Sequence, residues 1–205
     1  MLEEKREKFK IISEKVGQIF SKFGPSPNQY TLISLFFVLI SFYSLIKQNL
    51  LGALIFFLIA AFLDFVDGAV AKFSKKETKK GAYLDTICDR YVEGIILLGF
   101  LFLPLPDFLL PAKIWIFLAF FGSLMTTYTK AAAKEKGLVE TELKKGLFGR
   151  AERIILIILA IFLGIFNLNW VIYPIIILAI FSNITAIERI FLNFAPSQNQ
   201  SIRAH

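Results

Sequence analysis

The stretch from Leu50 to Asp89 reads LLGALIFFLIAAFLDFVDGAVAKFSKKETKKGAYLDTICD. It begins with an apolar block from Leu50 to Ala71, continues through a basic run from Lys72 to Lys80, and becomes apolar again from Ala82. The hydrocarbon core of a bilayer is about 30 Å thick, and an α-helix needs roughly 20 apolar residues to cross it. This stretch therefore predicts two membrane helices joined by a short basic loop.

The composition of the whole chain also indicates a membrane protein. Of its 205 residues, 56% are hydrophobic and 19% are charged, whereas soluble domains average roughly 45–50% apolar and about 25% charged residues. This balance excludes a soluble globular domain. Cys88 is the single cysteine, so neither an intramolecular disulfide nor a cysteine-based zinc site is expected. The charged first ten residues predict no cleavable secretion signal.

Six apolar blocks of membrane-helix character occur along the chain. They are Tyr30–Ile46, Leu50–Ala71, Ala82–Leu103, Ala112–Ala132, Ile154–Phe166 and Trp170–Leu192. We expect the short fifth block to begin earlier, between Arg150 and Arg153. The loops between the blocks are short, so sequential helices should be antiparallel neighbours. The predicted fold class is all-α, an integral membrane bundle of six transmembrane helices preceded by a cytoplasmic amphipathic juxtamembrane helix.

The segment before the first block predicts that amphipathic helix. Its apolar residues recur at helical spacing among Lys and Glu; they are Phe9, Ile12, Val16, Ile19 and Phe20. We interpret it as a helix lying on the cytoplasmic membrane face; the alternative is a solvated helix packed on a loop of the same protein. The predicted organisation is a juxtamembrane helix in 1–24, a six-helix membrane domain in 25–193 and a polar tail in 194–205.

The positive charges predict the orientation. Of the 23 Lys and Arg residues, all but Lys47 and Lys113 fall on one side of the predicted membrane, and cytoplasmic loops retain Lys and Arg. We therefore expect a multi-pass protein of the cell membrane, with both termini on the cytoplasmic side. Many of the lysines are also explained as contacts with anionic lipids.

Four aspartates lie at the cytoplasmic ends of the second and third blocks. Asp64 and Asp67 are three residues apart and Asp85 and Asp89 are four apart, so each pair projects from one helix face. A carboxylate at membrane depth costs a few kcal/mol and needs compensation. The alternative, pairing with the surrounding lysines, explains one pair of acids but not all four.

Small residues accompany these acids. Gly68 and Ala71 continue the face of Asp64, and Gly81 opens the next helix, so little side-chain bulk is expected around the carboxylates. Oxygen ligands beside exposed backbone are suited to a hard divalent cation and a phosphate-bearing ligand. The sequence therefore predicts a site for both.

The spacing of these residues resembles the signature of the CDP-alcohol phosphatidyltransferases, D-x2-D-G-x2-A-R-x8-G-x3-D-x3-D. Every fixed position matches except Lys72, where that family has Arg. Lys72 keeps the charge and loses the bidentate fork of a guanidinium. The resemblance covers essentially the whole chain and implies six transmembrane helices preceded by a juxtamembrane helix.

The resemblance implies roles for the matched residues. One or two Mg²⁺ or Mn²⁺ ions would be held by the four aspartates, Asp64, Asp67, Asp85 and Asp89. Asp89 would also be the general base that removes the proton of the acceptor hydroxyl. The nucleotide would be bound by Asn28, Asp67, Gly68, Ala71, Lys72, Gly81 and Asp85, with Asn28 included on the short match Ser26-Pro27-Asn28.

Four cations are candidates for binding a phosphate on the acceptor. They lie at the cytoplasmic ends of three predicted helices and are Lys130, Arg150, Arg153 and Arg189. Their arrangement, with the Asp89-Arg90-Tyr91-Val92-Glu93 segment, resembles the inositol-phosphate-using branch of the family; Ala132 departs from it, because some members have Arg there. The alternative is that each cation only sets the orientation of the chain in the membrane and binds no substrate.

The resemblance implies an enzyme of phospholipid biosynthesis. It would transfer a phosphatidyl-type group from CDP-archaeol or CDP-diacylglycerol to an inositol phosphate and release CMP. The expected partners are these substrates, membrane lipids and a second copy of the chain in a homodimer, and no nucleic acid. Alternatives are a glycerol-phosphate acceptor, a phosphotransferase that uses CDP-inositol, or, outside enzymes, a small cation transporter. The clustering of the acids at one membrane level argues against a continuous ion path.

Overall fold

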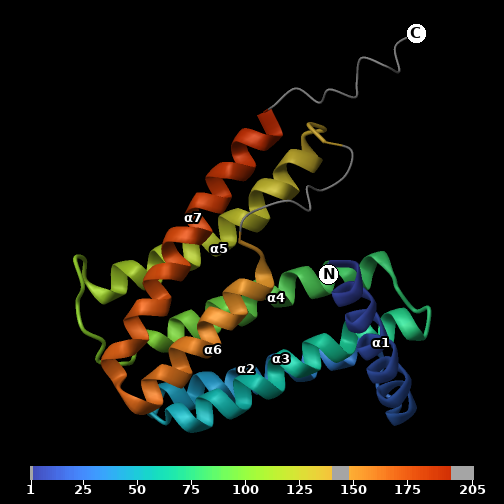
Figure 1. Ribbon diagram of the computed structural model, residues 1–205, viewed down its shortest axis with the longest axis horizontal. Helices are drawn as coiled ribbons and strands as arrows, with labels where there is room; N and C mark the ends of the chain where they lie inside the picture. The colour runs from blue at the N-terminus through green and yellow to red at the C-terminus, as the bar shows by residue number, and fades with distance from the viewer. Residues whose placement is uncertain (1, 140–147, 195–205) are drawn as a thin grey trace. The chain divides into compact units, whose positions relative to one another are not determined.

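The structure is a computed structural model that describes residues 2–139 and 148–194, with side chains from residue 11 onward (Figure 1). The helices are α1 (Leu2–Phe20), η1 (Ser21–Phe23), α2 (Pro27–Ile46), α3 (Leu50–Phe73), α4 (Lys79–Phe100), α5 (Ala112–Glu135), α6 (Arg150–Phe166), η2 (Leu168–Val171) and α7 (Ile172–Phe194). Over these residues the prediction of an all-helical protein is confirmed. All but the first residue of the predicted tail 194–205 lies outside the described residues.

Two helices begin three residues before the apolar blocks that predicted them. Pro27 occupies the first turn of α2, where its missing N–H costs nothing, and the Ser26 backbone N–H donates to Gln29 Oε1 at 2.7 Å. At the start of α4, Thr78 Oγ1 accepts a hydrogen bond from the Gly81 N–H at 3.0 Å. Because capping residues are polar, hydropathy alone does not reveal these starts.

Within residues 2–139 and 148–194, three helical segments are long and apolar enough to cross a membrane: Pro27–Ile46, Leu50–Phe73 and Leu168–Phe194. The remaining helices are less apolar or shorter. α4 carries six charged side chains and α6 has only 17 residues, whereas α5 contains the polar run Thr126–Lys130. The structure therefore supports a membrane protein with three evident spans.

The chain divides into two compact units, residues 1–104 with 161–166, and residues 105–160 with 167–205. In unit 1, α2 packs along both α3 and α4. Its core includes Val38, Leu45, Phe57 and Phe100, each fully buried. α2 is thus the common neighbour of the two helices that carry the four aspartates.

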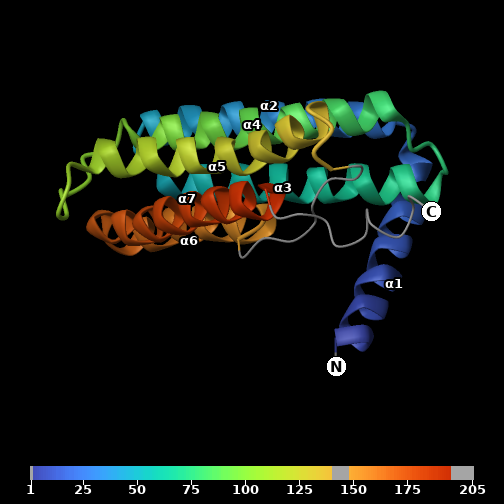
Figure 2. The same ribbon diagram turned by 90° about the horizontal axis from the view of Figure 1, so that it is seen from above.

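One face of α1 docks on α3 at the end where the aspartates lie. Gly17 allows the approach, because a Cβ there would lie 2.5 Å from the Ala69 carbonyl oxygen. Tyr30 donates from its hydroxyl to the Phe20 carbonyl at 2.9 Å, and α1 runs steeply away from the axes of α2 to α4 (Figure 2). Ile12 and Ile19 on the same helix are about half exposed.

In unit 2, α5 packs along α7 (Figure 1). Asn183 Nδ2 donates to the carbonyl oxygens of Leu118 and Ala179 at 2.9 and 2.8 Å. Gly122 faces Asn183 so closely that a Cβ there would lie 2.8 Å from the Asn183 backbone nitrogen. Close backbone approach at small residues is how membrane helices associate without a hydrophobic driving force.

We predict that Gly122→Ala destabilises the protein, because the added methyl group collides with both the side chain and the backbone nitrogen of Asn183, and the backbone of α7 cannot turn aside as a side chain can. Overpacking of this kind costs about 1–3 kcal/mol, visible as a lower Tm of the purified protein. Gly68→Ala is the matched control, since a Cβ at Gly68 has no heavy atom within 4 Å and Ala has the better helix propensity. Equal losses of stability in the two variants would contradict this account of the α5–α7 contact.

Candidate active site

The acidic cluster forms where α3 and α4 approach each other. Asp64 and Asp67 project from α3 and Asp85 from α4, and one carboxylate oxygen from each lies within 4.8 Å of the other two. Asp67 is buried, whereas Asp64 and Asp85 are partly buried. The structure therefore brings together three of the four aspartates that the sequence singled out.

Asp67 receives a hydrogen bond from a third helix. The Thr31 hydroxyl on α2 donates to Asp67 Oδ2 at 2.7 Å, and both residues are buried. The sequence pattern did not single out Thr31, although it lies one turn after Asn28 and so on the same face of α2. A short hydrogen bond to a charged acceptor both stabilises the carboxylate and fixes its orientation.

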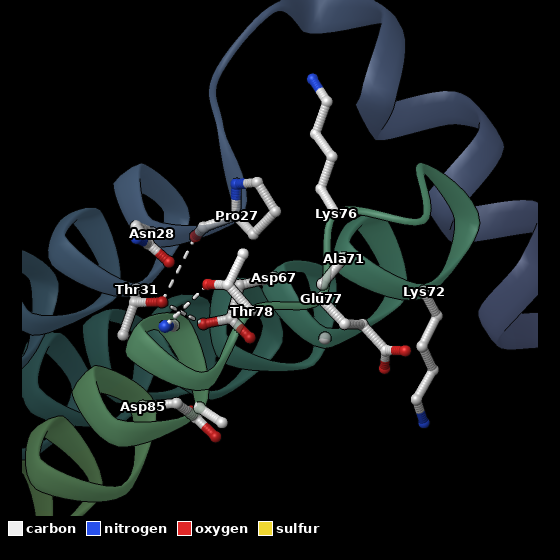
Figure 3. A pocket seen from close by; sticks show the side chains of 13 residues that line it. Pro27, Asn28, Thr31, Asp67, Ala71, Lys72, Lys76, Glu77, Thr78 and Asp85 are labelled. Carbon is white, nitrogen blue, oxygen red and sulfur yellow. Dashed lines mark hydrogen bonds between the residues drawn. The ribbon is translucent and has the colours of Figure 1, made fainter.

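A pocket of about 320 Å³ opens beside this cluster (Figure 3). It is lined by Pro27, Asn28, Thr31, Asp67, Gly68, Ala71, Lys72, Lys76, Glu77, Thr78, Gly81, Ala82 and Asp85. This set contains every residue assigned to the nucleotide in the sequence analysis. Pro27, Thr31, Lys76, Glu77, Thr78 and Ala82 are the lining residues that the sequence pattern did not indicate.

Two glycines line the pocket, and the missing side chain has a different effect at each. At Gly81 a Cβ would lie 3.1 Å from both Asn28 Oδ1 and Thr78 Oγ1, so glycine allows the start of α4 to pack against α2. At Gly68 a Cβ would meet no heavy atom within 4 Å, so the missing side chain leaves pocket space open to a ligand.

Positive charge lies at the rim of the pocket. Lys72 and Lys76 are exposed, and their amines extend away from Asp67 (Figure 3). The pocket also includes the first turn of α4, and the N-terminus of a helix favours anionic groups. The pocket thus combines carboxylates on its wall with positive potential at its edge.

Asp89 lies one turn beyond Asp85 on α4 and is buried, but it is not part of the close group of three carboxylates. Arg90 Nη2 lies 3.7 Å from Asp89 Oδ2 and 3.3 Å from Glu93 Oε1. Glu93 is buried as well. Asp89 is thus a buried carboxylate beside a guanidinium group and a second buried acid.

Two of the four candidate acceptor cations come together in unit 2. Arg153 Nη1 donates to Thr126 Oγ1 at 3.1 Å, and Arg189 Nη1 donates to the Thr126 carbonyl oxygen. Both arginines are buried, whereas Lys130 and Arg150 are partly buried. The structure thus places a pair of buried cations around one residue of α5.

The three carboxylates fit a divalent cation. Mg²⁺ takes oxygen ligands at about 2.1 Å, so ligands on opposite sides of one ion lie about 4.2 Å apart. Carboxylate oxygens within 4.8 Å of one another approach that separation, and all donors are hard oxygens. A cation also offsets the mutual repulsion of three clustered acids.

Comparison with known proteins identifies the family. The sequence profile of the CDP-alcohol phosphatidyltransferases matches residues 25–185, which include the aspartate signature. The chain belongs to this family. The expected family membership is thus confirmed, and the protein is a transferase.

Curated relatives of this phosphatidyltransferase match most of its length. It is 34% identical over 193 residues to the archaetidylinositol phosphate synthase of Pyrococcus horikoshii, covering 93% of this chain and 95% of the relative. It is also 34% identical over 185 residues to a bifunctional IPC transferase and DIPP synthase of Aquifex aeolicus, covering 85% of this chain and 40% of that larger protein.

The fold of this phosphatidyltransferase is that of a solved enzyme. Crystal structures of Mycobacterium tuberculosis phosphatidylinositol phosphate synthase match at 22% identity. The structure with CDP-DAG bound has a TM-score of 0.75 and covers 90% of this chain and 94% of that one. The complex with manganese and citrate has a TM-score of 0.76 and covers 89% of each chain.

We predict that Thr31→Val weakens divalent-cation binding by about 10- to 100-fold, the usual effect of removing an outer-shell partner of a metal ligand. Valine keeps the shape of threonine but cannot donate to Asp67. The measurement is a titration of the purified phosphatidyltransferase with Mn²⁺. Thr31→Ser retains the hydroxyl and serves as the control; equal affinity in the valine variant and the wild type would contradict the assigned role of Thr31.

Proposed function

We propose that this phosphatidyltransferase transfers a phosphatidyl-type group from a CDP-lipid to the hydroxyl of an inositol phosphate and releases CMP. The observation that carries the proposal is the convergence of three signature carboxylates beside a polar pocket in a chain of this family. Similarity along the full length of an archaetidylinositol phosphate synthase supports inositol phosphate as the acceptor.

The pocket of unit 1 would bind the donor. We assign the nucleotide to Asn28, Asp67, Gly68, Ala71, Lys72, Gly81 and Asp85, all of which line it. One or two Mg²⁺ or Mn²⁺ ions would be held by Asp64, Asp67 and Asp85, with Asp89 as a further ligand. The manganese in the complex of the Mycobacterium tuberculosis enzyme supports this choice of metal.

The reaction forms one bond to phosphorus and breaks another. The acceptor hydroxyl attacks the phosphorus on the lipid side of the diphosphate, and the bond from that phosphorus to the bridging oxygen breaks, so CMP leaves with the bridging oxygen. Asp89 takes the proton of the acceptor hydroxyl as general base. A bound divalent cation would neutralise the diphosphate and stabilise the departing CMP.

The cations of unit 2 would bind the acceptor. We assign the phosphate of inositol phosphate to Lys130, Arg150, Arg153 and Arg189. Guanidinium groups bind phosphate through paired, charge-assisted hydrogen bonds. The burial of Arg153 and Arg189 at the ends of two helices supports this role over a plain topology signal, because topology requires no buried charge.

We further propose the membrane arrangement that the sequence predicted. Residues 1–24 form the juxtamembrane helix, 25–193 a domain of six crossings and 194–205 a tail. Both termini and the active site lie on the cytoplasmic side of the cell membrane, and two copies form a homodimer. Exposed Ile11, Ile12 and Ile19 on α1 support a helix that rests on a lipid surface, since apolar side chains of such helices enter the headgroup region.

We predict that the purified enzyme releases CMP from labelled CDP-archaeol or CDP-diacylglycerol at least about tenfold faster with inositol phosphate than with glycerol phosphate or serine, because a site built for one polar acceptor leaves its groups unpaired with another. Chelation of divalent cations should abolish the release, and Mg²⁺ or Mn²⁺ should restore it. Preference for glycerol phosphate, or turnover only when CDP-inositol is supplied, would identify one of the alternative activities instead.

We predict that Asp89→Asn lowers kcat by about 10²- to 10⁴-fold, because the amide cannot accept the proton of the acceptor hydroxyl. Binding of Mn²⁺ and of CDP-lipid should be largely retained, because Asp64, Asp67 and Asp85 remain. Asp85→Asn is the contrasting variant and should weaken Mn²⁺ binding directly. If turnover survived in Asp89→Asn, the general base would be another group.

A further inference from the structure

We propose that Thr126 is the positioning residue of the acceptor site: it sets the geometry at which Arg153 and Arg189 meet a phosphate group. This inference rests on the proposed function, because it concerns the same acceptor. Thr126 lies on α5 and is fully buried, as Arg153 and Arg189 nearly are, with 2% and 5% exposure. It contacts both guanidinium groups at once.

The two contacts use different atoms of Thr126. Its hydroxyl oxygen accepts from Arg153 Nη1 at 3.1 Å, and its backbone carbonyl accepts from Arg189 Nη1. Both acceptor atoms belong to this one residue, and the two guanidinium groups come from different helices, α6 and α7. A guanidinium has five N–H donors in a rigid plane, so anchoring one of them restricts where the other four can point.

The Thr126 hydroxyl is itself oriented. It donates its proton to the Ser123 carbonyl one turn earlier, at 2.8 Å, so its lone pairs are directed away from that turn and toward Arg153. A hydroxyl that could rotate freely would hold Arg153 less firmly. The direction of the hydrogen bond between Arg153 and Thr126 therefore follows from the backbone of α5.

α5 is in turn pinned to α7 on both sides of Thr126. The hydroxyls of Ser123 and Ser182 lie 3.5 Å apart on one side, and Asn193 Nδ2 donates to the Thr129 carbonyl at 3.4 Å on the other. These contacts fix the register between Thr126 and Arg189. The two arginines are thus presented by a rigid support, as a site selective for a phosphate monoester requires.

Three variants test the inference. Thr126→Val keeps the shape of the side chain and removes the acceptor for Arg153; Thr126→Ser keeps that acceptor. Thr185→Val is the matched control, because Thr185 is a second fully buried threonine of unit 2 whose hydroxyl has no hydrogen-bond partner among the described residues. Thr126→Ala replaces the valine variant if that protein does not fold.

We expect Thr126→Val to raise the KM for inositol phosphate by about 10- to 100-fold, the range for losing a hydrogen bond to a buried charged group, while the KM for CDP-lipid stays unchanged. Thr126→Ser and Thr185→Val should both stay within about threefold of the wild type. An unchanged KM in Thr126→Val, or an equal rise in Thr185→Val, would overturn the inference.

A double-mutant cycle separates positioning from general packing. If Thr126 acts through Arg153, Thr126→Val should have little further effect on binding in an Arg153→Ala background. A full additional effect in that background would show that Thr126 only packs the core and would contradict the positioning role.

The proposed function and this inference can fail separately. Lack of CMP release by the wild type with inositol phosphate would contradict the proposed acceptor. The positioning role is then measured without turnover, from the rise in Tm that inorganic phosphate produces by binding the folded protein. The rise should be smaller in Thr126→Val than in Thr126→Ser, and equal rises would overturn the role of Thr126.

Discussion

The mutual repulsion of clustered carboxylates is the constraint on which unit 1 depends. Three aspartates on α3 and α4 bring oxygens within 4.8 Å of one another, in a chain whose helices are largely apolar. Hydrogen bonds to the carboxylates lower the cost of such a cluster, and a bound cation would lower it further. α2 supplies the hydrogen bond from Thr31, and its packing along both α3 and α4 brings that donor to Asp67. The core packing of this unit and its polar site therefore depend on the same helix.

In unit 2 the clustered charges that repel one another are positive instead of negative. Arg153 and Arg189 are buried around Thr126, and the small and polar residues between α5 and α7 hold that arrangement. Within the proposed function, the two polar centres correspond to the two substrates: carboxylates that take a cation and with it a diphosphate, and guanidinium groups that take a phosphate directly. Family membership and the full-length relatives are consistent with this division between donor and acceptor.

Much of the fold was predictable because helices depend on local pattern. The six apolar blocks correspond to α2 through α7, and the early start expected for the fifth block matches α6 at Arg150. The starts of α2 and α4 were placed too late, because their first turns are polar and are stabilised by caps at Ser26 and Thr78. α1 was predicted as a helix, yet its docking on α3 through Gly17 involves a contact between distant segments that periodicity does not encode.

The sequence by itself determined the helices, the family and the faces that carry the acids, because spacings of three and four residues fix a helix face and the signature spacing is unusual. Only the tertiary structure decided which groups meet. Thr31 reaches Asp67 across 36 residues of chain, and Arg153 reaches Thr126 across 27. Threonine is a common residue in helices, so neither was distinguished until packing placed its hydroxyl against a buried charge. Packing also left Asp89 outside the group of three acids whose carboxylate oxygens lie within 4.8 Å of one another.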